Sequence, residues 1–162
     1  MRKTVNVGIP PKHLRDAELE MEQSFIPLIL NRIIKGLAVT TNLPKHFKLG
    51  EGHMRFFYDK LHYLHARYLE IGRECVARGV GAFTFDLSND WNKVPSDLYN
   101  DWNPNRMDIE VIFSYLQKED PQYYTCRKFT EILADYNPYF DAKKKEGVVF
   151  ILENNGYDTV TK

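Results

Sequence analysis

Aromatic and cationic side chains alternate in the segment PQYYTCRKF, and this pattern is typical of surfaces that hold nucleobases and phosphates. Tyr123 and Tyr124 carry rings on which a base can stack. Arg127 and Lys128 follow within about one helical turn and carry charges that suit a phosphate. A tyrosine pair that seals a helix junction is an equally good interpretation of the two rings. The segment therefore predicts a nucleotide contact and leaves a packing role open.

The histidines and cysteines do not have the spacing of a metal site. His62 and His65 lie one helical turn apart, but no motif supplies the further ligands that a zinc ion needs, so a solvated helix face is expected. Cys75 and Cys126 are far apart and lack CxxC spacing, which favours two small core residues in a reducing environment. We therefore predict no metal, no other cofactor and no disulfide.

Composition limits the class of protein and of partner. The chain has 162 residues, with 22 Lys and Arg against 22 Asp and Glu. Tight binding of duplex DNA through its phosphates is disfavoured, because it usually requires a clear basic excess. No apolar run is long enough to span a membrane, and the N-terminal residues contain no apolar signal-peptide core. These features predict a cytoplasmic protein with weak or no duplex DNA binding and no membrane contact.

Hydrophobic periodicity predicts a mainly α fold, a compact single-domain bundle of three to four helices. The predicted helices run from about Lys12 to Gly36, from Met54 to Gly79, from Pro104 onward and from Pro121 to Leu133. In the second, apolar residues recur at alternating spacings of three and four and form one stripe: Met54, Phe57, Leu61, Leu64, Tyr68, Ile71 and Cys75.

The last part of the chain differs from the helical part. Two β-prone runs flank Asn155-Gly156, a pair that is typical of a hairpin turn. We therefore divide the chain into a helical domain, residues 1–136, and a C-terminal extension with a β-hairpin, residues 137–162.

The stretch LGEGHMRFFYDKLHYLHARYLEIGRECVARG, residues 49–79, resembles the phage pyrimidine-dimer DNA glycosylases, a family of small helical repair enzymes also called endonuclease V. That family has the pattern Leu-Gly-x-Gly-His-x-x-Phe-Phe-Tyr-Asp-Lys-Leu, followed by a helix that ends in Glu-Cys-x-x-Arg-Gly. The resemblance implies the endonuclease V fold. It also implies a pocket for an extruded base, since enzymes that act on bases take them out of the stack.

The chain departs from the family at the residues that do the chemistry. In the family, the N-terminal amine attacks the sugar C1′ to form a Schiff base, and a Glu on the first helix stabilises the sugar cation. Aligned on Pro27, the family pattern Arg-Glu-x-Pro-Arg becomes Ser24, Phe25, Ile26, Pro27 and Leu28, so Phe25 stands at the catalytic Glu position. Thr4 aligns with the start of the family chain. We therefore assign no catalytic residue and expect Phe25 to pack in the core beside Ile29.

The remaining polar residues near the family's site suit a ligand that binds without being cleaved. A carboxylate such as Glu18 or Glu22 can accept hydrogen bonds from a base edge, and cations can hold one or two phosphates. The predicted ligand-binding residues are Arg15, Glu18, Glu22, Arg106, Tyr123, Tyr124, Arg127 and Lys128.

Three functions fit the sequence. The first is a non-catalytic nucleotide-binding protein on a glycosylase scaffold, which in a phage would sequester a host signalling nucleotide such as a cyclic dinucleotide. The second is an active glycosylase and abasic-site lyase. The third is a protein-interaction module, including a homo-oligomer, that keeps only the fold. The neutral charge and Phe25 favour the first and third over the second, and the retained aromatic and polar groups favour the first.

Overall fold

The structure is a computed structural model and describes residues 2–81 and 87–143, without the side chains of residues 137–143. The predicted mainly α class is confirmed, because every regular element in these ranges is helical. The predicted hairpin at Asn155-Gly156 lies outside the described residues. The α-helices are α1 (Asp16–Ile34), α2 (His53–Phe56), α3 (Leu61–Arg78), α4 (Ser88–Trp91), α5 (Arg106–Glu119) and α6 (Cys126–Lys143), and the 3-10 turns are η1 (Pro11–His13) and η2 (Ser96–Leu98).

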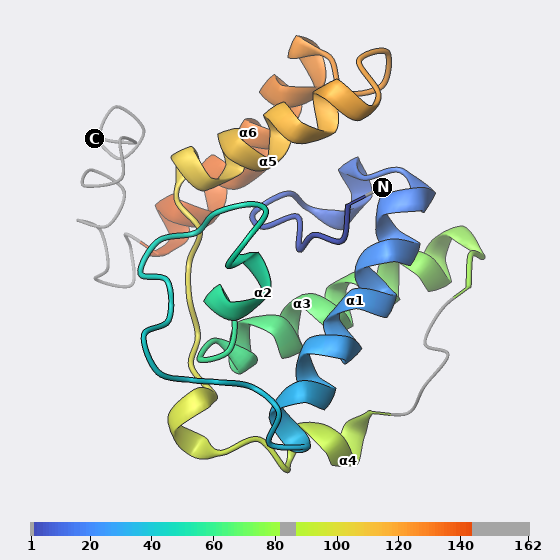
Figure 1. Cartoon of the computed structure of the whole chain (residues 1–162). Coiled ribbons are helices and arrows are strands. Elements are labelled where there is room, and N and C mark those ends of the chain that lie inside the picture. The colour runs from blue at the N-terminus through green and yellow to red at the C-terminus, as the bar shows by residue number, and fades with distance from the viewer. Residues whose placement is uncertain (1, 82–86, 144–162) are drawn as a thin grey trace. The chain divides into compact units, whose positions relative to one another are not determined.

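The described residues form two compact units. Unit 1 comprises residues 2–5, 14–81 and 87–103, and unit 2 comprises residues 6–13 and 104–143. In unit 1, α1 packs against α3 (Figure 1). In unit 2, α5 packs against α6 through Phe113 and Phe129, whose ring centroids lie 4.8 Å apart. None of the helices in the described ranges combines the length and the apolar character that a bilayer crossing requires.

Helix α1 begins at Asp16, later than its predicted start near Lys12. Residues 11–13 form the separate turn η1, and the helix begins where the backbone N–H of Arg15 donates to Glu18 Oε1, at 3.2 Å, in a capping box. The end of the helix is as predicted, because Gly36 adopts a left-handed φ of 70° directly after the C-cap.

The long helix predicted from Met54 to Gly79 is wrong, because a break separates α2 from α3. Between the two helices, the backbone N–H groups of Phe57, Tyr58 and Lys60 each donate to the carbonyl oxygen three residues back, at 3.1, 3.1 and 2.9 Å, so tight turns replace the α-helical hydrogen bonds. The break also places the Lys60 ammonium 3.9 Å from the Phe56 ring centroid and 3.1 Å from the Phe56 carbonyl oxygen. The apolar stripe predicted from the sequence therefore continues across a break in the helix, while the predicted end at Gly79, with a φ of 70°, is confirmed.

The last described helix, α6, begins at Cys126 rather than at Pro121. The Tyr123 N–H donates to Asp120 Oδ1 at 3.1 Å, and the Lys128 N–H donates to Thr125 Oγ1 at 3.1 Å, so residues 120–125 form a turn with its own caps. Cys126 is exposed at the first position of α6, which corrects its prediction as a core residue, whereas Cys75 is buried as predicted. Helix α6 continues past residue 136 to Lys143.

The segment 6–13 belongs to unit 2 because its backbone lies close to α5. Gly8 has a φ of 73°, and a Cβ placed there would lie 2.5 Å from Ile109 Cγ1, so no other residue fits this contact without displacement. His13 bonds Asp135 on α6, and the Lys12 ammonium lies 3.3 Å from the same carboxylate. This carboxylate therefore ties the segment to α6.

We expect the tie at Asp135 to weaken in acid. The hydrogen bond from His13, and to a lesser degree Lys12, hold the pKa of the Asp135 carboxyl below its usual value. A depressed carboxyl pKa stabilises the folded state above the unfolded pKa, about 3.9 for Asp, and this stabilisation is lost as the pH falls through the folded pKa. Asp135→Asn should therefore reduce hydrogen-exchange protection of the His13 amide at neutral pH, and the difference between the two proteins should decrease as the pH falls through the folded pKa of Asp135. Equal protection in the two proteins at neutral pH would contradict the tie.

Candidate functional site

Where the resemblance to the glycosylases predicts that a family member has its catalytic Glu, the structure places an apolar ring in the core of unit 1. Phe25 is buried, and its ring stacks on that of His53, with centroids 6.1 Å apart and planes 9° from parallel. Ile26 and Ile29 are buried on the same helix. The predicted packing of Phe25 is confirmed, and a phenyl ring cannot exchange a proton or stabilise a cation as a carboxylate does.

The nearest upstream carboxylate on α1, Glu22, is fully buried and bound to Arg67 of α3. Arg67 donates from Nε to Glu22 Oε2 at 2.6 Å and from Nη2 to Oε1 at 3.2 Å. Burial alone lowers the pKa of the Arg67 guanidinium, but the charge and hydrogen bonds of Glu22 outweigh burial and raise that pKa above its usual value. A ligand contact through Glu22 would therefore compete with Arg67 for both carboxylate oxygens.

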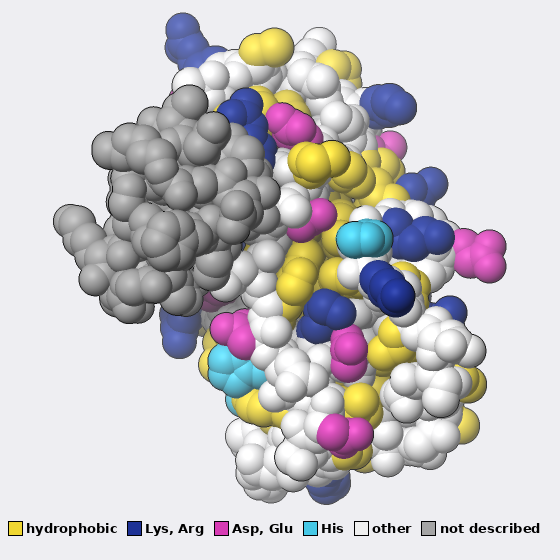
Figure 2. Space-filling model, turned by 90° about the vertical axis from the view of Figure 1, so that its left-hand side faces the viewer, with side chains coloured by type: hydrophobic (Ala, Val, Ile, Leu, Met, Phe, Trp, Pro, Cys, Tyr) yellow, Lys and Arg dark blue, Asp and Glu magenta, His cyan; other side chains and the backbone are white. Residues whose placement is uncertain are grey.

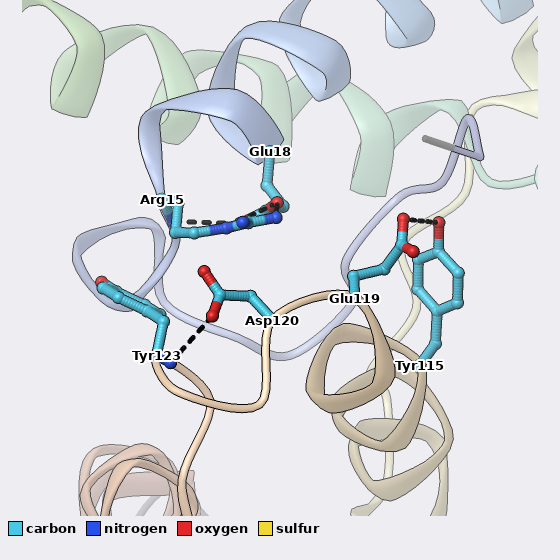
Figure 3. A network of polar contacts seen from close by, with 6 residues as sticks. All are labelled: Arg15, Glu18, Tyr115, Glu119, Asp120 and Tyr123. Carbon is cyan, nitrogen blue, oxygen red and sulfur yellow. Dashed lines mark hydrogen bonds and ion pairs between the residues drawn. The ribbon is translucent and has the colours of Figure 1, made fainter.

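A second arginine and carboxylate pair lies at the start of α1 (Figure 3). Arg15 Nε donates to the two carboxylate oxygens of Glu18 at 2.9 and 3.0 Å, and Nη2 contacts Oε2 as well. The Glu18 side chain is 1% exposed and that of Arg15 27% exposed. Of this pair, the Arg15 side chain is therefore the part that solvent reaches.

In unit 2, the predicted aromatic and cationic residues gather around the turn before α6. Tyr123 is half-buried, and the Lys128 ammonium lies 4.9 Å from its ring centroid. Arg127 is exposed on the same first turn of α6. We call Tyr123, Arg127 and Lys128 the Tyr123 surface. It combines three of the eight residues predicted from the sequence, with a ring and an ammonium in contact and an exposed guanidinium on the same helical turn as the ammonium.

Two further residues predicted to bind the ligand, Tyr124 and Arg106, are not part of the Tyr123 surface. Tyr124 is fully buried and packs edge-on against Phe113, with centroids 5.9 Å apart, which is the packing role that the sequence left open. Arg106 is the first of the 14 residues of α5, so the length of this helix, about 20 Å at 1.5 Å per residue, separates it from the Tyr123 turn. Its guanidinium Nε lies 3.3 Å from Glu110.

His65 corrects the prediction of a solvated histidine face on α3. Its ring stacks on Trp91 at 4.4 Å, and its Nδ1 lies 2.7 Å from the Tyr99 hydroxyl. Burial, and then the nearby charge of His62, lower the pKa of His65. Within the ranges that the structure describes, no group of three or more His, Cys, Asp or Glu side chains is arranged to hold a metal ion.

His53 is part of the family-like motif at residues 49–79, but its burial and its hydrogen bonds were not predicted from the sequence. Gly52 adopts a φ of 88° immediately before it, and His53 is then the first residue of α2 and buried. The glycine pair at residues 50 and 52 was the available signal, since left-handed glycines indicate a tight turn that aims the next side chain.

Charge on the surface is mixed rather than uniform. On the face drawn in Figure 2, Lys and Arg side chains alternate with Asp and Glu and with hydrophobic groups. Binding of duplex DNA through its phosphates usually requires a continuous basic surface, and the face drawn in this figure is not one. No protein-family model matches this sequence.

Proposed function

We propose that this protein binds a small nucleotide and leaves it chemically unchanged, on a scaffold that resembles the pyrimidine-dimer glycosylases. The observation that carries the proposal is the Tyr123 surface. A half-buried ring with an ammonium beside it and an exposed arginine next in sequence to that lysine suits a base and one or two phosphates, because the ring can stack on the base while Arg127 and Lys128 contact phosphate oxygens. A cyclic dinucleotide is one ligand of this chemistry, and its sequestration would be the protein's role in a phage.

The residues of unit 1 support binding over cleavage. Schiff-base chemistry requires a positioned amine and a group that stabilises the sugar cation. Thr4, which aligns with the family's first residue, has a peptide nitrogen that lies 3.3 Å from Met21 Sδ. Phe25 replaces the carboxylate, and Glu22 is bound to Arg67. Both parts of the family's chemistry are therefore missing from the positions where the alignment expects them.

Tyr123→Ala should weaken nucleotide binding about tenfold or more, because one stacked base contributes roughly 1–3 kcal/mol. The measurement is calorimetry of the full chain against a panel of mono-, di- and cyclic dinucleotides. Tyr115→Ala is the matched control, since Tyr115 is another half-buried tyrosine of unit 2 and its hydroxyl lies 3.1 Å from Glu119 (Figure 3). This control should retain the affinity of the original protein.

Two further readouts separate the proposal from its alternatives. Ligand recovered after denaturation should be intact, and borohydride should trap no covalent adduct on abasic or dimer-containing duplex DNA. A trapped adduct would favour the glycosylase function. No binding of any panel member at high micromolar concentration would refute the proposal and favour a protein-interaction module.

A further inference from the structure

His53 connects the N-terminal arm, residues 2–5, to the core of unit 1. The Val5 backbone N–H donates to His53 Nε2 at 3.0 Å, across 48 positions of sequence. On the other side of the ring, Nδ1 lies 2.8 Å from the Lys48 carbonyl oxygen. Both ring nitrogens are thus occupied by backbone groups of segments that are distant from each other in the sequence.

These two contacts determine which nitrogen of His53 carries the proton. A carbonyl oxygen only accepts, so Nδ1 must donate to Lys48. A peptide N–H only donates, so Nε2 must present a lone pair to Val5. The arrangement requires the neutral Nδ1–H tautomer, because a proton on Nε2 would face the Val5 N–H.

We propose that His53 is an acid-sensitive latch, which holds the N-terminal arm on unit 1 while the imidazole is neutral and releases the arm when Nε2 is protonated. Thr4 and Val5 are both fully buried, so their release would expose side chains that are now in the core. This inference goes beyond nucleotide binding and does not depend on it, since every group involved belongs to unit 1.

The surroundings of His53 offer little compensation for a positive charge. Phe25 of α1, Phe47 of the preceding loop and Phe57 after α2 surround the ring, with centroids 5.3–6.1 Å away. Glu22 of α1 attracts a charge at His53, but Arg67 of α3 already binds both oxygens of Glu22. Arg2 on the arm itself repels such a charge.

The direction of the pH dependence follows from these neighbours. Burial is the largest influence and lowers the pKa of His53, against smaller opposite effects from the Lys48 carbonyl and Glu22. A histidine whose folded pKa is lowered stabilises the folded arm above the unfolded pKa of about 6.5. That stabilisation decreases as the pH falls below 6.5 toward the folded pKa.

The test is native-state hydrogen exchange of the full chain between pH 7.5 and pH 5, with rates corrected for intrinsic exchange. The protection factor of the Val5 amide should fall about tenfold for each pH unit between 6.5 and the folded pKa of His53. The amides of Ile29 and Ile71 in the core should retain their protection over the same range. The pH at which His53 titrates, followed by NMR of its ring, should mark the end of this decrease.

Two variants distinguish the latch from general acid sensitivity. His53→Gln keeps an oxygen that can accept from Val5 but does not titrate, so Val5 protection should become independent of pH. His65→Gln removes the other histidine of unit 1 whose pKa is lowered and should leave the pH dependence of Val5 unchanged.

Two results would overturn the latch. One is constant Val5 protection in the original chain while NMR shows that His53 becomes protonated. The other is a parallel loss of protection at Val5, Ile29 and Ile71, which would mean global acid unfolding. Both can be observed without the variants, so a His53→Gln chain that fails to fold would not remove the test.

Discussion

Arg67→Met is expected to lower the free energy of unfolding by about 3–5 kcal/mol, because it leaves the Glu22 carboxylate buried without its cation. The Glu22 side chain is 0% exposed and that of Arg67 is 5% exposed, so water does not replace the lost partner. Chemical denaturation followed by far-UV circular dichroism measures the change. The slope of the transition should stay constant if the variant alters stability alone.

Arg78→Met is the matched control for Arg67→Met on the same helix. Arg78 pairs with Glu74 at 2.7 Å and with Asp16 at 2.9 Å, but its partners are 24% and 55% exposed. Ion pairs in such positions contribute about 0.2–1 kcal/mol, so the control should be almost as stable as the original chain.

The double variant Glu22→Leu, Arg67→Met tests whether the unpaired charge is the cause. Replacing both partners by apolar groups of similar volume removes the buried charges and is often neutral or stabilising by about 1–4 kcal/mol. The double variant should therefore recover most of the stability lost in Arg67→Met. A double variant as unstable as the single one would show that packing, and not charge, determines the loss.

Phe25→Ala should cost about 3–5 kcal/mol of unfolding free energy, the usual loss for a fully packed phenylalanine, because the cavity it leaves cannot close completely. Phe25 is 3% exposed and contacts His53, so the truncation also removes a stacking partner. Thermal and chemical denaturation of the variant measure the loss.

Leu28→Ala, three residues further along α1, is the control for Phe25→Ala. Leu28 is 42% exposed, so its truncation should cost less than about 1 kcal/mol. If Phe25→Ala proved as mild as Leu28→Ala, Phe25 would line an open pocket instead of filling the core.

Some features of the fold follow from short-range properties of the chain, and the sequence predicts them. The end of α3 at Gly79 depends on one residue that adopts a left-handed backbone at low cost. The burial of Phe25 agrees with the mainly apolar run FIPLILNRII, although one face of the helix, with Leu28, Asn31 and Arg32, meets solvent. The aromatic and cationic character of the Tyr123 surface can likewise be identified within six adjacent residues.

Other features depend on contacts between distant residues, and only the tertiary structure shows them. The periodicity from Met54 to Gly79 does not reveal the break after α2, because Phe57 and Leu61 continue the apolar stripe across it and are both buried. No local pattern pairs Glu22 with Arg67, which lie 45 positions apart.

The hydrogen bonds of the histidines show most clearly which features depend on tertiary structure. His53 and Val5 are 48 positions apart, and His13 and Asp135 are 122 apart. The spacing of apolar residues along a helix or strand specifies which of its faces is buried. A hydrogen bond between distant residues, however, requires that the whole fold bring a donor and an acceptor within about 3 Å of each other. The sequence by itself therefore determined the helical class and the short segment that holds Tyr123, Arg127 and Lys128, and tertiary packing decided which polar groups are bound in the core and which face solvent.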